Sequence, residues 1–125
     1  MTRIPEKERD ILEQAIYLPM VLTILERDLQ IIEMSAFKLK RPYLDLIEET
    51  MKVIQKDLAD VKRFMKQNKL KVEKLKQDEA FTMYLFLYHG YEEQHNYFNP
   101  RIRNKVQELM TYYLFKRHFT KQTSG

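Results

Sequence analysis

The chain of 125 residues carries 22 basic and 18 acidic side chains, for a formal net charge of +4, and it contains no Cys. The lack of Cys excludes a disulfide framework, thiolate zinc sites, iron–sulfur clusters and cysteine catalysis. A composition that is 44% hydrophobic, with 2 Gly and 4 Pro, excludes a disordered chain and favours long helices in one domain over residues 1–125. An apolar run of about 18 residues and a leader pattern are both absent from the sequence, so we expect a cytoplasmic protein without a membrane partner.

The first long helix is predicted over residues 6–34. Apolar side chains recur there at alternating spacings of three and four residues, from Ile11 to Ile32, as in a helix that faces a core. Pro19 lies inside this stripe, where a proline removes one backbone hydrogen bond. The sequence therefore predicts a kink near Pro19, and the alternative is two shorter helices that break at Leu18.

A second long helix is predicted over residues 42–68. Pro42 suits its first turn, and its apolar positions keep the same spacing from Leu44 to Met65. The linker before it, residues 35–41, is short, so the two helices are expected to fold back as an antiparallel hairpin.

Two shorter helices are predicted in the second half, over residues 79–97 and 100–118. Asp78 is a suitable N-cap for the first of them, and Asn99 followed by Pro100 is a suitable start for the second. Together with the hairpin, these helices predict an all-α fold.

Aromatic side chains gather in this second half, where residues 81–119 hold 11 of the 15. One interpretation is that shorter helices need bulky side chains to fill the core against the hairpin. The other is an exposed aromatic surface for a partner or a second copy of the chain, with Tyr97 and Phe98 as candidates. Tyrosines beside Arg101 and Arg103 would also suit stacking on single-stranded nucleic acid.

Basic residues are concentrated between residues 62 and 76, with a smaller group near residue 103. The two interpretations are a solvated face and a binding surface for nucleic acid or an acidic partner. Within this region, residues 69–77 alternate apolar and lysine side chains as an exposed strand would, and a continued or frayed helix fits them equally well. The candidate binding residues are Lys62, Arg63, Lys66, Lys69, Lys71, Lys74, Lys76, Arg101, Arg103 and Lys105.

One weak metal-site candidate occurs in the predicted third helix. Glu92 and His95 have the i, i+3 spacing that places two side chains on one helix face, and His89 is close to them in sequence. A dimetal bundle needs a second such pair and two further glutamates. The chain has only one such pair, and the glutamates of the long helices, Glu26, Glu33, Glu48 and Glu49, are expected at exposed heptad positions. The alternative is that Glu92 and His95 form hydrogen bonds near the start of the last helix, and we expect no cofactor.

Enzymatic motifs are missing from the sequence. There is no Gly-x-Ser-x-Gly motif, and the two glycines cannot form the usual phosphate-binding loops. We therefore expect a protein that is not an enzyme and has no small-molecule substrate.

Three segments resemble a family of small helical proteins from Bacillus-type Firmicutes, the YhjD-like group. The segments are IYLPMVLTILERD (residues 16–28), LKRPYLDLIEETMKVIQKDL (residues 39–58) and GYEEQHNYFNPRIRNKVQELMTYYL (residues 90–114). The most distinctive stretch runs from Tyr97 to Arg103. The resemblance implies a soluble bacterial protein and transfers no catalytic residue.

The sequence as a whole predicts an all-α helical bundle, built on a long antiparallel hairpin with two shorter helices packed on it. The leading functional hypothesis is an interaction or regulatory protein whose partner is another protein or a second copy of the chain, because the apolar face of the hairpin is broad. Nucleic-acid or acidic-partner binding through residues 62–76 is the alternative, and a metal-binding bundle is the second alternative.

Overall fold

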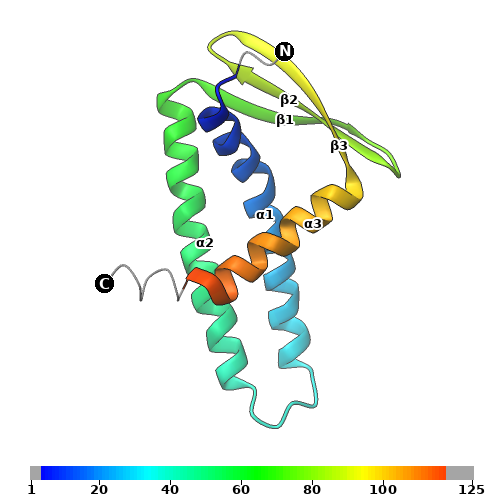
Figure 1. Ribbon diagram of the computed structural model, residues 1–125. Helices are drawn as coiled ribbons and strands as arrows, with labels where there is room; N and C mark the ends of the chain where they lie inside the picture. The colour runs from blue at the N-terminus through cyan, green and yellow to red at the C-terminus, as the bar shows by residue number, and fades with distance from the viewer. Residues whose placement is uncertain (1–3, 118–125) are drawn as a thin grey trace.

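The structure is a computed structural model that describes residues 4–117, and it is an α+β fold (Figure 1). The all-α helical bundle predicted from the sequence is therefore wrong, because residues 70–98 form a three-stranded antiparallel sheet of order β1-β2-β3. In chain order the elements are α1 (Glu6–Glu33), α2 (Arg41–Gln67), β1 (Leu70–Gln77), β2 (Phe81–Tyr88), β3 (Tyr91–Phe98), α3 (Asn99–Thr111) and the π-helical turn η1 (Tyr112–Lys116).

The two long helices are present as an antiparallel hairpin, with the sheet at one end of it (Figure 1). Their predicted apolar stripes meet, and Leu12, Val21 and Ile54 are fully buried between them. α1 runs without interruption through Pro19, so the alternative of two helices that break at Leu18 is wrong.

The predicted helix over residues 79–97 is wrong, because this segment forms β2 and β3. His89 and Gly90 connect the two strands with φ angles of 48° and 86°. A two-residue hairpin turn of type I′ has positive φ at both central positions, and glycine adopts such an angle at little cost. The turn therefore reverses the chain at the point where a helix was expected to continue.

β1 begins directly after α2, where Lys69 takes a positive φ of 54°. The strand pairs with β2 from Leu70 onward, and its register shifts between Lys74 and Lys76, which leaves Leu75 in a bulge. Of the two interpretations of residues 69–77, the strand is confirmed. Charged side chains and a bulge on this edge strand disfavour uncontrolled pairing with other strands.

α3 leaves the end of β3 and crosses back over the helical hairpin (Figure 1). It covers the first part of the predicted helix over residues 100–118, of which residue 118 lies outside the described residues. The aromatic side chains divide between core and surface, since Phe86 is fully buried whereas Phe98 is half exposed. That the exposed ones contact a partner or a second copy of the chain stays a prediction. Within residues 4–117, no helix is long and apolar enough to cross a membrane.

Candidate functional site

The middle strand β2 presents apolar side chains on both faces of the sheet, and only one of these faces is covered by the described helices. Side chains on a strand alternate between faces, so Thr82, Tyr84 and Phe86 of β2 point toward the helices and are 2%, 6% and 0% exposed. We call this side the inner face. The alternate residues of β2, Met83 and Leu87 among them, are only partly buried and point the other way, where Figure 1 shows none of the described helices.

The opposite side of the sheet is called the outer face, and its middle strand is entirely apolar. Phe81 and Phe98 close one end of it with ring centroids 5.4 Å apart, and they are 41% and 49% exposed. Polar and charged side chains of the two edge strands border this apolar strip. By the strand register, the outer face comprises Phe81, Met83, Leu85 and Leu87 of β2, Lys71, Glu73 and Lys76 of β1, and Glu92, Gln94, Asn96 and Phe98 of β3.

The register also arranges these side chains in rows across the strands. Leu87 pairs with Lys71 on one side and with Glu92 on the other. One row therefore carries a cation, an apolar side chain and an anion in that order, and all three lie on the same face. The ionic residues of this row are exposed.

Asn99 joins the sheet to α3 through its side chain. Its Nδ2 donates to the backbone oxygens of Asp78 and Glu79 at 2.9 and 3.1 Å, and its Oδ1 accepts from the Thr82 hydroxyl at 2.7 Å. The structure thus places Asn99 as the first residue of α3 and a brace on the β1–β2 turn, instead of the side-chain N-cap that the sequence predicted.

Asp78 organises the same turn instead of capping a third helix. Its Oδ1 accepts hydrogen bonds from the backbone N–H groups of Phe81 at 2.7 Å and Ala80 at 2.8 Å. These two bonds stabilise the charged carboxylate and hold the pKa of Asp78 below its ordinary value of 3.8. Aspartate commonly forms such turns, which explains why the same residue type suited both interpretations.

Tyrosines fix the inner face and η1 to the hairpin. The Tyr97 hydroxyl donates to Glu13 Oε2 at 2.8 Å, and the Tyr113 hydroxyl donates to Asp57 Oδ2 at 2.6 Å. Burial, followed by the hydrogen bond to the carboxylate, raises the pKa of each of these two tyrosines above 10.0. Burial, followed by the nearby Glu13 carboxylate, raises the pKa of Tyr17 to about 12.

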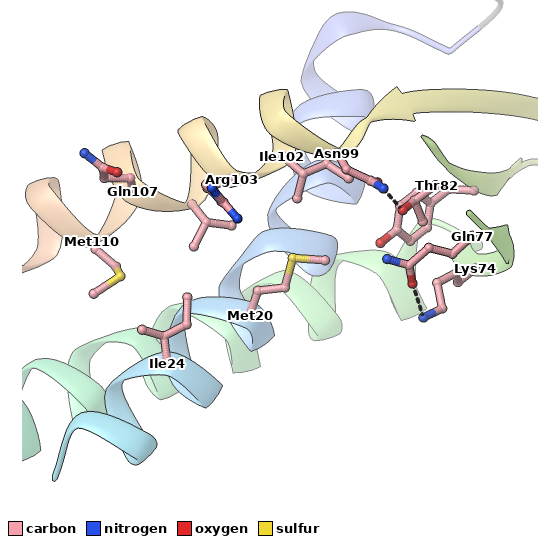
Figure 2. Close-up of a pocket in the computed structure, with 12 residues that line it drawn as sticks. Met20, Ile24, Lys74, Gln77, Thr82, Asn99, Ile102, Arg103, Gln107 and Met110 are labelled. Carbon is pink, nitrogen blue, oxygen red and sulfur yellow. Dashed lines mark hydrogen bonds between the residues drawn. The ribbon is translucent and has the colours of Figure 1, made fainter. Parts of the chain in front are cut away.

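A groove of about 580 Å³ lies between α1, α3 and the inner face of the sheet, and we call it the α1–α3 groove (Figure 2). Figure 2 shows Met20 and Ile24 of α1 on one side and Met110 of α3 on the other. Lys74 and Gln77 of β1 lie at the sheet end, where Lys74 Nζ is 3.3 Å from Gln77 Oε1.

The predicted basic stretch is divided among three elements. Lys62, Arg63 and Lys66 lie on α2, Lys69 lies in the turn that follows, and Lys71, Lys74 and Lys76 lie on β1. On the strand they separate further, because Lys71 and Lys76 lie on the outer face and Lys74 on the inner face. Several of the basic side chains have acidic neighbours, as in the ion pairs of Arg63 with Asp60 at 3.0 Å and Lys105 with Glu108 at 3.7 Å.

One member of each basic group borders the same groove. Lys74 of β1 and Arg103 of α3 both line the α1–α3 groove. Arg101, two residues before Arg103, lies instead beside Tyr97 and Phe98 in a second hollow. Nucleic-acid binding through these residues stays a prediction.

The metal-site candidates are separated by the strand conformation. Glu92 and His95 belong to β3, where a spacing of three places side chains on opposite faces, and His89 lies in the hairpin turn. The i, i+3 argument required a helix and is therefore wrong. His95 instead stacks on Phe86 at 4.5 Å, and its Nε2 is 3.0 Å from Glu93 Oε1. Among residues 4–117, no group of three or more metal-binding side chains occurs.

Met83, Leu85 and Leu87 are surface residues that the helical periodicity did not predict. A continuous apolar run fits a helix and a fully buried strand equally well, and it was interpreted as a helix. The signal that could have separated the two was the His89–Gly90 pair, since a glycine between two eight-residue segments, FTMYLFLY and YEEQHNYF, favours a hairpin turn.

Comparisons with known proteins cover nearly the whole chain. A family model described as "YhjD protein" matches residues 3–118. A protein of Bacillus subtilis (strain 168), named "Uncharacterized protein YhjD", is 50% identical over 115 residues, which are 92% of this chain and 96% of that protein. No solved structure matches the chain.

Proposed function

We propose that this chain, which belongs to the YhjD family, is a non-enzymatic interaction module of the cytoplasm that forms a homodimer through the outer face of its sheet. The family predicted from the sequence is confirmed by the two matches, and the interaction role is our proposal. The observation that carries it is the pattern of β2. A strand that is apolar on both faces is typical of a sheet enclosed between two layers, and residues 4–117 supply only one such layer.

A second copy fits the outer face because the face is complementary to itself. Consider two sheets packed face to face about a two-fold axis that is parallel to the strands. This operation places β1 of one copy over β3 of the other and keeps each residue at its own level along the strand. Leu87 would then pack on its counterpart, and Lys71 of each copy would face Glu92 of the other.

The size of the face sets the expected affinity. Strands of eight residues and a width of three strands give a face of roughly 26 by 14 Å, from about 3.3 Å per residue and about 4.8 Å between strands. This flat area is about half of the ~800 Å² that each partner buries in a standard interface. We therefore expect a dimer that dissociates in the micromolar range, and self-association that depends on protein concentration.

A charge-swap experiment tests the proposed orientation. Lys71→Glu alone and Glu92→Lys alone each place like charges opposite one another twice per dimer, and each is expected to raise the dimer dissociation constant about 3- to 10-fold. The double variant with both changes restores two attractive pairs and is expected to return the dissociation constant close to the wild-type value. Size-exclusion chromatography with light scattering, at several loading concentrations, measures all four proteins.

Lys62→Glu is the matched control, because it makes the same charge change at an exposed position that belongs to α2 and is not part of the outer face. It is expected to leave the dissociation constant unchanged. Tighter association of the Lys71→Glu variant would contradict the proposed orientation, since that result requires β1 of one copy to face β1 of the other. A double variant that associates as weakly as the single variants would contradict it equally.

A further inference from the structure

The α1–α3 groove has the composition of a small-molecule site. Its volume of about 580 Å³ lies within the ~300–1,000 Å³ typical of ligand pockets. Its walls are mostly apolar, with Met20 and Ile24 of α1 facing Ile102, Val106 and Met110 of α3. Methionines on both walls give the groove flexible side chains that can adapt to an apolar guest.

The groove exists because α3 does not cover all of the apolar stripe of α1. Leu25, on the side of α1 that contacts the rest of the core, is 1% exposed, whereas Ile24 is 38% exposed. The apolar stripe of α1 is broad enough to suggest a dimer. Part of its breadth is explained by the groove, which Met20 and Ile24 line within one chain. Since the groove lies on the inner side of the sheet, this inference is independent of the proposed dimer.

Charge distinguishes the groove from an ordinary packing defect. Lys74 and Arg103 both line it, and none of the described residues around it is acidic. The neighbour of Lys74 Nζ is the neutral amide oxygen of Gln77, and within residues 4–117 Arg103 has no carboxylate within ion-pair distance. Elsewhere some exposed cations are neutralised within the chain, as Arg41 is by Asp45 at 3.1 Å, whereas the two cations of the groove have only neutral groups beside them in the groove lining.

We propose that the α1–α3 groove binds an amphipathic carboxylate of the medium-chain fatty-acid class. The alkyl chain would lie between Ile24 and Met110, and the carboxylate would lie toward the sheet end, within reach of Lys74 and Arg103. A guanidinium and an ammonium group are the natural partners of a carboxylate, and the apolar walls exclude water from the alkyl chain. This ligand is bound without being transformed, so it differs from the small-molecule substrate whose absence the sequence predicts.

The first test compares three probes that share a ten-carbon chain and differ in charge. Isothermal titration calorimetry with decanoate, decanol and decylammonium, each kept below its micelle-forming concentration, measures their affinities for the full chain. We expect decanoate to bind with a stoichiometry of one per chain and at least about tenfold more tightly than decanol, because its charge gains hydrogen bonds to two cations. Decylammonium is expected to bind most weakly. Equal affinities for decanoate and decanol, or no binding of decanoate, would overturn the proposal.

Two pairs of variants locate the binding. Arg103→Glu is expected to weaken decanoate binding about tenfold or more, whereas Arg101→Glu, on the same helix but outside the groove, is expected to leave it unchanged. Ile24→Trp fills the groove and is expected to abolish binding. Ile31→Trp makes the same change at a 55% exposed position of α1 outside the groove and is expected to preserve binding.

Because all four positions are exposed, each variant is expected to fold, and circular dichroism and thermal unfolding check this. Decanoate that binds the folded Ile24→Trp variant as tightly as the wild type would show that the ligand lies elsewhere, which overturns the proposal. Equal losses from Arg103→Glu and Arg101→Glu would overturn the role of the groove cations.

Discussion

The two faces of β2 differ in their environment more than in their composition. On the inner face, Tyr84 and Phe86 are 6% and 0% exposed because α1 and α3 pack on that side. On the outer face, Leu85 and Leu87 are nearly as apolar, yet they remain partly exposed. An apolar strand face is usually covered by another layer, and residues 4–117 cover only the inner face of β2.

The largest expected effect is a difference in stability between alanine variants of the inner and the outer face of β2. Phe86→Ala removes a fully buried ring and is expected to lower the free energy of unfolding by about 3–5 kcal/mol. Leu85→Ala, one residue away on the outer face, is expected to cost less than about 1.5 kcal/mol in the monomer, because its side chain is already partly in water. Urea unfolding at low protein concentration measures both variants, and equal losses would contradict the assignment of inner and outer faces.

Alkaline pH is expected to lower the stability of the core on the inner side of the sheet, because a buried tyrosine there must lose its proton. Tyr17 packs there in the core, and burial raises its pKa from 10.0 to about 12. Since the folded-state pKa lies above the unfolded value, the stability that neutral Tyr17 contributes is complete below pH about 10 and is lost as pH rises through about 12. The free energy of unfolding is therefore expected to fall over this range.

Tyr17→Phe is expected to make that decline shallower, because phenylalanine has no proton to lose. Tyr43→Phe is the control, since Tyr43 is 53% exposed on α2, and it should leave the pH profile unchanged. Chemical unfolding at a series of pH values measures both profiles. A Tyr17→Phe profile that overlays the wild-type profile would contradict the buried role of this hydroxyl.

A smaller effect is expected where α3 is joined to the sheet. Asn99→Ala leaves the Thr82 hydroxyl without its acceptor and two backbone oxygens of the β1–β2 turn without their donor. The expected loss of stability is about 1–3 kcal/mol. Asn104→Ala, at an exposed position of the same helix, is expected to change stability by less than about 0.5 kcal/mol. Thermal unfolding distinguishes the two, and similar melting temperatures would argue against Asn99 as a brace.

The two long helices could be predicted from the sequence because polar residues separate their apolar residues at the helical spacing. Along α2 the apolar side chains recur between charged ones, so only a helical spacing fits the pattern. β2 has the sequence FTMYLFLY, in which nearly every position is apolar, and such a run matches the helical and the strand period equally. Gly90 is the residue that favours a hairpin over a continuous helix. Its place in the turn depends on the pairing of β2 with β3, which local periodicity does not reveal.

The outer face and the α1–α3 groove could not be predicted from the spacing of apolar residues in the sequence. The pairing of Lys71 with Leu87 and of Leu87 with Glu92 follows from the strand register, which the hairpin turn and the bulge at Leu75 fix. That Lys74 and Arg103 line one groove depends on the path of α3 across α1. The sequence therefore offered the basic residues as candidates but could not indicate which of them would line one groove.

The most direct test of the uncovered outer face is sedimentation equilibrium of the wild-type chain and of Leu85→Glu, from micromolar concentration to about 1 mM. The account predicts that the wild-type mass rises with concentration from 15.3 kDa toward twice that value. The Leu85→Glu variant is expected to stay monomeric and folded, because two carboxylates would meet at the centre of the interface. A wild-type chain that remains monomeric at about 1 mM, or a Leu85→Glu variant that associates as tightly as the wild type, would contradict it.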